Sequence, residues 1–146
     1  MNERVIVKVK RLVPEGLPPK QAKKGDAAFD LYSVVDYELR AGESYGVPTG
    51  IALEIPHGYE GQIRPRSGLA LKNGITITNS PGTIDSGYRG EVRIIVHNLS
   101  REPFKISRGM RIAQIAIRPV PEVDFIEVEE LEESDRGEGG FGSTGT

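Results

Sequence analysis

The sequence predicts an all-β domain, built as a jelly roll or distorted barrel with one short helix, and three observations support this. The 146 residues include 18 glycines and 10 prolines, which argues against long helices. Apolar runs are short, and turn residues separate them at an even spacing, as in sandwiches and barrels. Only residues 67–73 have the composition of a helical turn, with Ser67 as its cap and Gly74 after its end.

The first strand is expected at residues 5–9, where apolar and charged side chains alternate. An extended loop over residues 12–25 follows, because this stretch contains three prolines and two glycines. The remaining strands are predicted at residues 29–32, 37–39, 45–47, 50–55, 59–64, 75–78, 91–98, 104–106 and 111–118. Residues 93–96 and 112–117 are the most apolar, and they are expected to lie deepest.

Composition and charge exclude several classes of function. The net charge is −2 and basic residues form no long run, so nothing indicates a nucleic-acid partner. The chain has no cysteine, which excludes disulfides and thiolate metal sites. No apolar stretch approaches the length of a membrane span and no hydrophobic leader is visible, so we expect no membrane association and a cytoplasmic location.

Residues 1–121 are expected to form the β-rich domain, and the character of the chain changes after Pro121. Residues 122–135 carry eight acidic residues and no basic one, yet apolar side chains punctuate the first part. This pattern indicates an edge strand that pairs on the domain or on a neighbouring subunit, followed by an acidic spacer. A solvated charge run explains residues 132–135 equally well.

The last eleven residues, 136–146, form a tail that contains five glycines. Glycine is costly to order, so the tail should be flexible until a ligand holds it. Its chemistry suits a phosphorylated, ring-bearing ligand: Arg136 can fork onto phosphate oxygens, and Phe141 can lie on a flat base. Ser143 and Thr144 add hydroxyl donors. The alternative is a flexible Gly/Ser tail without a ligand.

Two segments place polar residues where strand packing does not require them. In PRSGLA, Arg66 and Ser67 stand at the start of the short helix, where free N–H groups favour an anion. An ordinary helix cap behind a solvent-exposed arginine explains this segment equally well. In RGMRIAQ, Gln114 interrupts an apolar strand, and its amide needs either neighbouring backbone or a ligand as partner.

A third segment, residues 79–90 (NSPGTIDSGYRG), is predicted to form a hairpin that presents Asp85 and Tyr88. An aspartate beside serine and glycine is usually a turn-former, and catalysis is the alternative. The two histidines are interpreted as structural or solvent-exposed, since His57 falls in a turn and His97 ends a strand.

Taken together, five segments resemble the ordered motifs of the trimeric dUTPase family, the deoxyuridine triphosphate nucleotidohydrolases. They are AAFDLYS from Ala27, PRSGLA from Pro65, GTIDSGYRG from Gly82, RGMRIAQ from Arg108 and RGEGGFGSTG from Arg136. The resemblance covers nearly the whole chain in both order and spacing. It implies a jelly-roll-like subunit, a closed homotrimer and active sites built at subunit interfaces.

The resemblance also implies a reaction, the hydrolysis of dUTP to dUMP and pyrophosphate, which keeps uracil out of DNA and supplies dUMP for thymidylate synthesis. By this resemblance, Asp85 is the general base that directs a water onto the α-phosphorus. Asp30 would hold waters of a Mg²⁺ ion without ligating it directly, because Mg²⁺ keeps waters and prefers phosphate oxygens.

The same resemblance assigns the other motif residues to parts of the nucleotide. Tyr88 would pack on the deoxyribose and leave no room for a 2′-hydroxyl. The uracil edge would pair with main-chain groups of the predicted hairpin, those of Thr83, Ile84 and Asp85, with Asn79 assisting. The phosphates would be bound from a neighbouring subunit by Arg66, Ser67, Gly68 and Gln114. Arg93 occupies a further nucleotide-contacting position. The tail would close as a lid through Arg136, Phe141, Gly142, Ser143 and Thr144.

One residue departs from the family pattern, and two other functions fit the motifs in part. The first motif usually has glycine where this chain has Ala28, which would be strained at positive φ; otherwise a small residue suffices. A dCTP deaminase shares this kind of fold, but its family lacks the Gly-Phe-Gly-Ser-Thr tail and the tyrosine-centred third motif. A non-catalytic nucleotide-binding regulator is disfavoured by the intact Asp85 and tail.

Overall fold

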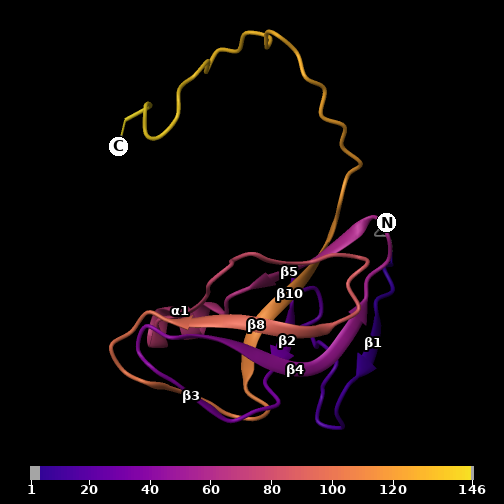
Figure 1. The fold of residues 1–146 in the computed structure, drawn as a ribbon, viewed down its shortest axis with the longest axis vertical. Coiled ribbons are helices and arrows are strands. Elements are labelled where there is room, and N and C mark those ends of the chain that lie inside the picture. Colours follow the sequence, from indigo (N-terminus) through magenta and orange to yellow (C-terminus); the bar gives the residue numbers. More distant parts are fainter. Residues whose placement is uncertain (1–3, 146) are drawn as a thin grey trace.

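The computed structural model describes residues 4–145, and within this range two antiparallel sheets pack as a sandwich from which a long arm extends (Figure 1). The first sheet has the order β1 (Lys8–Arg11), β4 (Ser44–Glu54), β8 (Glu91–Asn98) and β6 (Ile75–Ile77). The second has the order β2 (Phe29–Tyr32), β10 (Arg111–Pro119), β5 (Tyr59–Arg64) and β7 (Gly82–Ile84). A ribbon pairs β3 (Tyr37–Leu39) with β9 (Phe104–Ile106). The predicted all-β, jelly-roll-like fold is confirmed.

The core lies between the two four-stranded sheets. In β8, side chains that point into this core alternate with side chains that point to the outer face. Val92, Ile94 and Val96 point inward and are at most 1% exposed. Arg93 and Ile95 point to the outer face and are exposed. The prediction that residues 93–96 lie deepest is therefore wrong for every second residue, because successive side chains of a strand face opposite ways.

In β10 most of residues 112–117 are buried, as predicted, because this strand lies inside the second sheet between β2 and β5.

Two strands differ from the prediction for reasons that involve distant partners. β1 covers Lys8–Arg11 instead of residues 5–9, because its pairing with Ile51–Glu54 of β4 sets its ends. β4 runs unbroken through Pro48 and Gly50, where two separate strands were expected. A bulge absorbs both residues: the register with β8 shifts between Pro48 and Ala52, and Gly50 has a φ of 70°.

Residues 79–90, which we call the crossover segment, do not form the predicted hairpin. β7 pairs with β5 in the second sheet, whereas the next strand, β8, lies in the first. The chain therefore passes from one sheet to the other over residues 85–90, and the residues of this motif stand at the border between the two sheets.

The single helix of the described residues, α1 (Ser67–Asn73), begins and ends at different kinds of signal. Its N-cap is Arg66, with extended backbone and no side-chain cap hydrogen bond, so the prediction that Ser67 caps the helix is wrong. Gly74 ends it with a φ of 65°, as predicted, and its N–H bonds the carbonyls of Ala70 and Leu69. No helix among residues 4–145 has the length and apolar character needed to cross a membrane.

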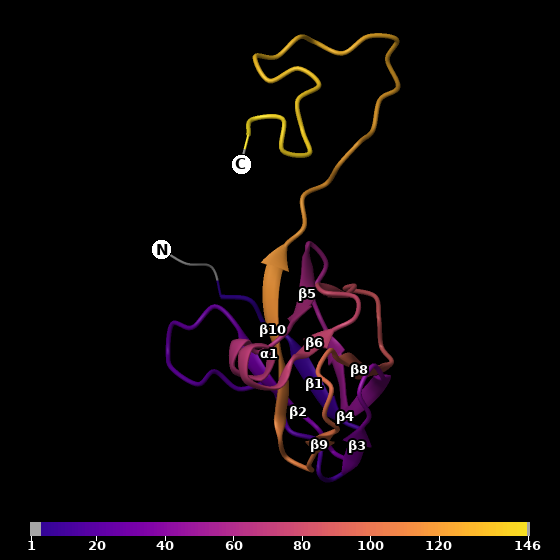
Figure 2. The same cartoon turned by 90° about the vertical axis from the view of Figure 1, so that its left-hand side faces the viewer.

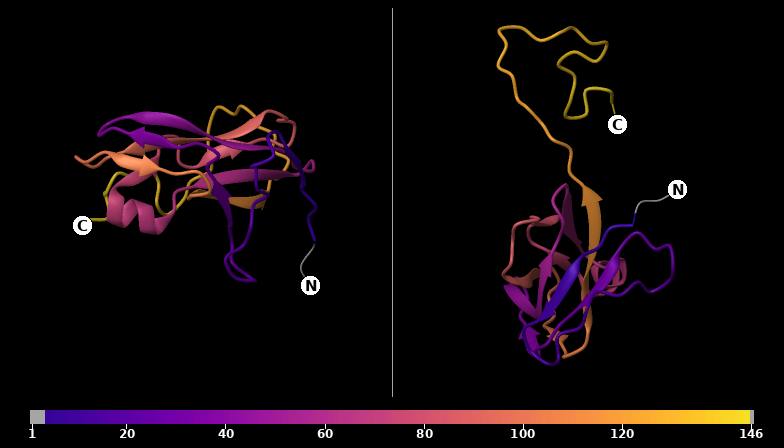
Figure 3. Two further views of the ribbon diagram at one scale, coloured as in Figure 1. Left: turned by 90° about the horizontal axis from the view of Figure 1, so that it is seen from below. Right: turned by 90° about the vertical axis from the view of Figure 1, so that its right-hand side faces the viewer.

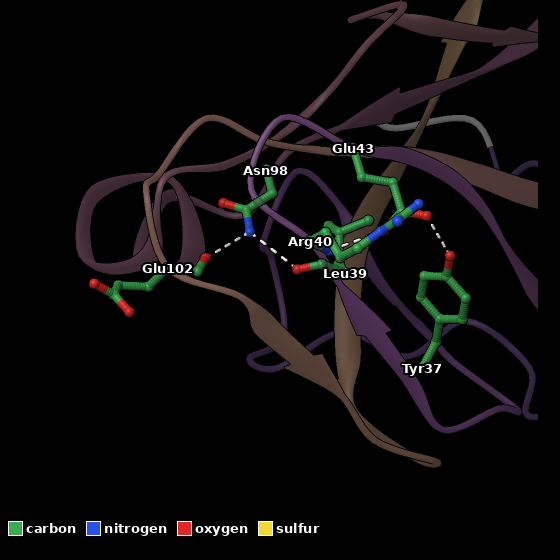
Figure 4. Close-up of polar contacts among 6 residues, drawn as sticks. All are labelled: Tyr37, Leu39, Arg40, Glu43, Asn98 and Glu102. Carbon is green, nitrogen blue, oxygen red and sulfur yellow. Dashed lines mark hydrogen bonds and ion pairs between the residues drawn. The ribbon is translucent and has the colours of Figure 1, made fainter.

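Asn98, at the end of β8, joins the β3–β9 ribbon to the first sheet (Figure 4). The side chain is fully buried, and its Nδ2 donates to the carbonyl of Leu39 at 3.1 Å and to that of Glu102 at 2.8 Å. Its Oδ1 accepts the N–H of Ser100 at 2.9 Å. A buried amide with all these partners fixes the position of the ribbon.

A second polar contact holds the other end of the turn after β3 (Figure 4). The hydroxyl of Tyr37 donates to the carboxylate of Glu43, which also accepts the N–H of Arg40 at 2.8 Å. This hydrogen bond lowers the pKa of Glu43 and raises the pKa of Tyr37. The Tyr37 ring stacks on that of Tyr45 with centroids 3.7 Å apart.

From the end of β10 the chain leaves the sandwich as an arm, residues 120–145, which contains no helix or strand (Figures 2 and 3). In the part of the arm from residue 122 to residue 135 the large apolar side chains are 55% to 97% exposed, and they are Val123, Phe125, Ile126, Val128 and Leu131. The edge strand expected in residues 122–135 is therefore not paired on this chain's own domain, and pairing with a neighbouring subunit stays a prediction. Residue 146 of the predicted tail and residues 1–3 lie outside the described residues.

Candidate functional site

An open pocket of about 350 Å³ lies where the crossover segment meets the outer face of the first sheet. Six of its lining residues were predicted to bind nucleotide, and they are Asn79, Thr83, Ile84, Asp85, Tyr88 and Arg93. The other lining residues are Gly46, Ile63, Ile77, Gly82, Glu91 and Ile95. Most of the residues predicted to contact uracil and sugar thus meet in one place.

β7 supplies one wall of the pocket, and its successive residues alternate between buried and exposed. Gly82 and Ile84 are buried, and a side chain at Gly82 would meet Ile63 of β5 at 3.1 Å. Thr83 and Asp85 point away from this packing and are exposed. Because β7 is the edge strand of the second sheet, one side of its backbone is unpaired by any strand in residues 4–145.

Asp85 stands at the start of a tight turn whose geometry is held by neighbouring residues. The N–H of Tyr88 donates to the Asp85 carbonyl at 3.1 Å, and the Arg89 guanidinium donates to the Ser86 carbonyl at 2.6 Å. The Asp85 carboxylate itself has no hydrogen bond or ion pair within residues 4–145. It is exposed on the pocket wall and is available to a water or a ligand.

Tyr88 is fixed against the next strand by a hydrogen bond and a close contact. Its hydroxyl donates to the carbonyl of Glu91 at 2.8 Å, while 45% of the residue remains exposed at the pocket. A Cβ at Gly90 would lie 2.5 Å from this hydroxyl oxygen, so glycine is required for the ring to lie here.

Glu91 lines the same pocket, although it lies outside the five motifs. It shares the outer face of β8 with Arg93, whose Nε lies 3.0 Å from Glu91 Oε1. The period of two along the strand was the available signal, since residues 91 and 93 must face the same way. Their common pocket could not be foreseen, because it depends on the path of the crossover segment.

A second group of predicted residues gathers away from this pocket, around Asp30. The Asp30 carboxylate is buried and lies 3.9 Å from Arg66 Nε and 3.6 Å from Arg111 Nη1. Arg66 also donates to the Arg111 carbonyl at 3.1 Å. Gln114 pairs with Asp30 across β10 and β2, and both residues line a polar pocket of about 230 Å³.

The donor set around Asp30 suits a Mg²⁺ ion held mainly by other ligands. Within residues 4–145 no three histidine, cysteine, aspartate or glutamate side chains gather as a metal site. One carboxylate already paired with two guanidinium groups cannot cage a cation, but it can accept hydrogen bonds from waters of a phosphate-bound ion. The residues present therefore fit the indirect role predicted for Asp30.

Ala28 takes an ordinary backbone conformation, since Phe141 is the only non-glycine residue with positive φ among residues 4–145. The departure from the family's glycine therefore brings no strain to the segment that carries Asp30.

The remaining predicted residues do not join either pocket. Ser67 and Gly68 lie exposed at the start of α1 beside Arg66. The tail folds only on itself: Arg136 Nε donates to the Gly139 carbonyl at 2.6 Å, and Phe141 is fully exposed. One chain thus presents the predicted base and sugar residues, the predicted phosphate residues and the lid as three separate groups.

Comparison with known proteins agrees with the order of motifs and with this fold. The family model described as dUTPase matches residues 16–145. A deoxyuridine 5′-triphosphate nucleotidohydrolase of Clostridium acetobutylicum is 54% identical over 141 residues, which is 97% of each chain. A solved structure of the Staphylococcus bacteriophage 80alpha dUTPase with dUPNHPP has a TM-score of 0.90 at 31% identity and covers 97% of this chain and 99% of that one.

A third relative is a mutant dUTPase from phage phi11 of S. aureus, whose structure reveals the coordination of a structural Mg(II) ion. It has a TM-score of 0.81 at 26% identity and covers 88% of this chain and 99% of that one. The match of the family model to most of the chain, together with relatives of the same length and fold, establishes that this chain belongs to the dUTPase family.

Proposed function

We propose that this chain hydrolyses dUTP to dUMP and pyrophosphate by in-line attack of a water on the α-phosphorus. The observation that carries the proposal is the Asp85 carboxylate, which is exposed and without a partner in the described residues on the wall of a pocket shared with Tyr88. The substrate is supported by the similarity to deoxyuridine 5′-triphosphate nucleotidohydrolases and to the phage dUTPase that was solved with dUPNHPP.

Uracil is recognised by the backbone of β7. An edge strand offers N–H and C=O groups in a fixed row, and Thr83 and Ile84 carry these groups along the pocket. A row built to pair the N3–H and O4 of uracil leaves polar groups unmatched when cytosine enters, which discriminates strongly. Asn79 adds a side-chain amide on the same wall.

The sugar lies against Tyr88, which excludes the 2′-hydroxyl of a ribonucleotide. A tyrosine free to rotate could make room for that oxygen. Here the hydrogen bond to the Glu91 carbonyl holds the ring in place, and the absence of a side chain at Gly90 leaves room for it.

Asp85 acts as the general base. A carboxylate on the pocket wall can accept a proton from a water and align that water with the phosphorus, a contribution of about 10²- to 10⁴-fold in rate. Mg²⁺, when bound to the phosphates, neutralises charge that develops during phosphoryl transfer, and Asp30 would hold it through water.

The active site is completed by other subunits of a homotrimer. Arg66, Ser67, Gly68 and Gln114 lie outside the pocket that contains Asp85, so a neighbouring copy would have to present its own set to the phosphates. The exposed tail, with Arg136 and Phe141, would then close over the nucleotide as a lid.

The arm connects the subunits of the proposed trimer. An apolar groove of about 410 Å³ runs between residues 5–9 and the second sheet, with Phe29, Leu53 and Ile115 among its lining residues. β1 is an edge strand that carries Lys8, Lys10 and Arg11. The arm of a neighbouring copy is acidic and carries exposed apolar side chains. It therefore matches the basic strand β1 in charge and the groove in hydrophobicity.

The proposal is tested by measuring pyrophosphate release from dUTP, dTTP, dCTP and UTP, with and without Mg²⁺. We expect turnover of dUTP that depends on Mg²⁺ and little turnover of the other three. Release of ammonia from dCTP would indicate the deaminase alternative. Nucleotide binding without any product would indicate the regulator, and either result would refute the proposal.

A further inference from the structure

The pocket contains a second carboxylate, Glu91, whose two oxygens are both engaged. Oε2 accepts the N–H of Gly50 at 3.0 Å, and Oε1 lies 3.0 Å from Arg93 Nε. The Glu91 side chain is 22% exposed, whereas that of Arg93 is 65% exposed. Unlike Asp85, this carboxylate has no oxygen free of protein partners, which makes it unsuited to accept a proton from water.

The contact between Glu91 and Gly50 depends on the bulge in β4. Where the register between β4 and β8 shifts, the ladder cannot pair every backbone group, and side chains replace it. Thr49 donates to the Val92 carbonyl at 2.5 Å, and Glu91 takes the Gly50 N–H. The carboxylate is therefore held from the backbone side at a closely packed position, since a side chain at Gly50 would lie 2.7 Å from Val13.

Arg93 is the more exposed partner in this pair. Its Nε is used by Glu91, and the two terminal nitrogens of its guanidinium have no partner within the described range 4–145. A guanidinium bound at Nε keeps its outer edge, with parallel N–H groups, for a second anion such as a phosphate.

We propose that Glu91 is a positioning residue for nucleotide binding: it holds Arg93 through Nε so that the outer edge of the guanidinium faces the phosphates of the bound nucleotide. The inference rests on the proposed hydrolysis of dUTP. It also assigns Arg93 a second task, because an unpaired Glu91 carboxylate in the pocket would repel a triphosphate.

The discriminating variant is Glu91→Gln. Its amide oxygen can still accept the Gly50 N–H, but its NH₂ group would face the Arg93 Nε–H, donor against donor. The hydrogen bond to Gly50 in the bulge of β4 is then kept, while Arg93 loses its contact with residue 91. We expect KM for dUTP to rise roughly two- to fivefold with kcat and Tm unchanged, as for a partly exposed ion pair that contributes to binding. Inhibition by an unhydrolysable imido analogue of dUTP should weaken to the same extent, and inhibition by deoxyuridine, which has no phosphate, should not change.

The same substitution in an Arg93→Ala background gives the decisive comparison. Without the guanidinium, Glu91 is an unmatched negative charge, so Glu91→Gln should lower KM there instead of raising it. Equal increases in KM in both backgrounds, a fall in Tm that accompanies the rise in KM, or equal weakening of deoxyuridine would each overturn the positioning role. Glu38→Gln, the same change at an exposed position of β3 outside the pocket, is the matched control.

Failure of this inference is distinguishable from failure of the proposed function. If the unaltered protein does not hydrolyse dUTP, the proposed function fails. The effect of Glu91→Gln in the unaltered protein and in Arg93→Ala can then still be compared through binding of the imido analogue. Weaker binding in the first and tighter binding in the second would support the pairing of Glu91 with Arg93.

Discussion

At Gly90 the absence of a side chain allows Tyr88 to take its place in the pocket. A Cβ there would lie 2.5 Å from the Tyr88 hydroxyl oxygen and 2.7 Å from Cζ. The aromatic wall of the proposed sugar site therefore depends on two residues, one that supplies the ring and one that makes room for it. The sequence motif contains both residues but does not show that they lie close together in the fold.

We predict that Gly90→Ala selectively damages sugar discrimination. The contact involves the far end of a side chain, so the fold survives while the Tyr88 ring is displaced. The preference for dUTP over UTP, measured as a ratio of kcat/KM values, should fall by about tenfold. Gly87→Ala is the control, because a Cβ at Gly87 meets nothing within 4 Å and should leave the ratio unchanged. An unaltered ratio in Gly90→Ala would show that Tyr88 does not select the sugar.

The motifs were sufficient to single out half of the residues that line the pocket, but not Glu91 or its partners. Asp85, Tyr88 and Arg93, which the resemblance assigned to the nucleotide, line one pocket, and their roles stay a prediction. The bond between Glu91 and the Gly50 N–H could not be predicted, because it exists only where a bulge shifts the register of β4 against β8. Long-range register leaves no signal in a local sequence pattern.

Among the elements, strands with clear turn residues on both sides were predicted to the residue. β2, β3, β5, β8 and β9 have the expected bounds. The errors arose where a strand pairs with a partner that is distant in the sequence. β4 continues through Pro48 because a bulge shifts its register against β8. β7 pairs with β5 instead of β8. Local turn residues in 79–90 therefore indicated a turn correctly, at residues 85–88, but the strands on either side of it belong to different sheets.

The hydrogen bond between Tyr37 of β3 and Glu43 in the turn after β3 should make the free energy of unfolding depend on pH. The hydrogen bond from Tyr37 lowers the pKa of Glu43 below its ordinary 4.5, so the stabilisation is present above that value and is lost as pH falls through the folded-state pKa. The same bond raises the pKa of Tyr37 above 10.0, so the stabilisation is present below that value and is lost as pH rises through the folded-state pKa.

We predict that Tyr37→Phe lowers the free energy of unfolding most between about pH 5 and pH 9, with a smaller loss at either extreme. Urea denaturation of the two proteins across this range measures the difference. Tyr45→Phe keeps the stacked rings without touching the bond to Glu43, so its effect should not vary with pH in this way. A loss for Tyr37→Phe that stays constant from acid to alkali would refute the linkage.

For the molecule as a whole, the arm is the part that one chain cannot explain. Phe125 is 97% exposed and Leu131 86% exposed, which an isolated domain would not favour. The sequence predicted an edge strand here but could not say on which molecule it pairs. The fold of a single chain removes one of the two options, because residues 120–145 form no strand on their own domain.

Two truncations separate the proposed roles of the arm. Deleting residues 122–146 should abolish the trimer of about 48 kDa, three times the 15.9 kDa of one chain, because the apolar groove loses its occupant. Deleting only residues 137–146 should leave the trimer intact and sharply reduce turnover of dUTP, because the lid is lost. Sedimentation analysis and pyrophosphate release measure the two effects. A trimer that persists after the longer deletion would contradict the arm's role in assembly.

The role of Asp85 as the general base is tested by the turnover of dUTP by the Asp85→Asn variant, compared with the affinity of that variant for an unhydrolysable dUTP analogue. The amide keeps the shape of the side chain but cannot accept the proton of the attacking water. We predict a fall in kcat of about 10²-fold or more, with analogue binding retained. Turnover at the unaltered rate, with the same affinity, would contradict the assignment of Asp85 as the general base.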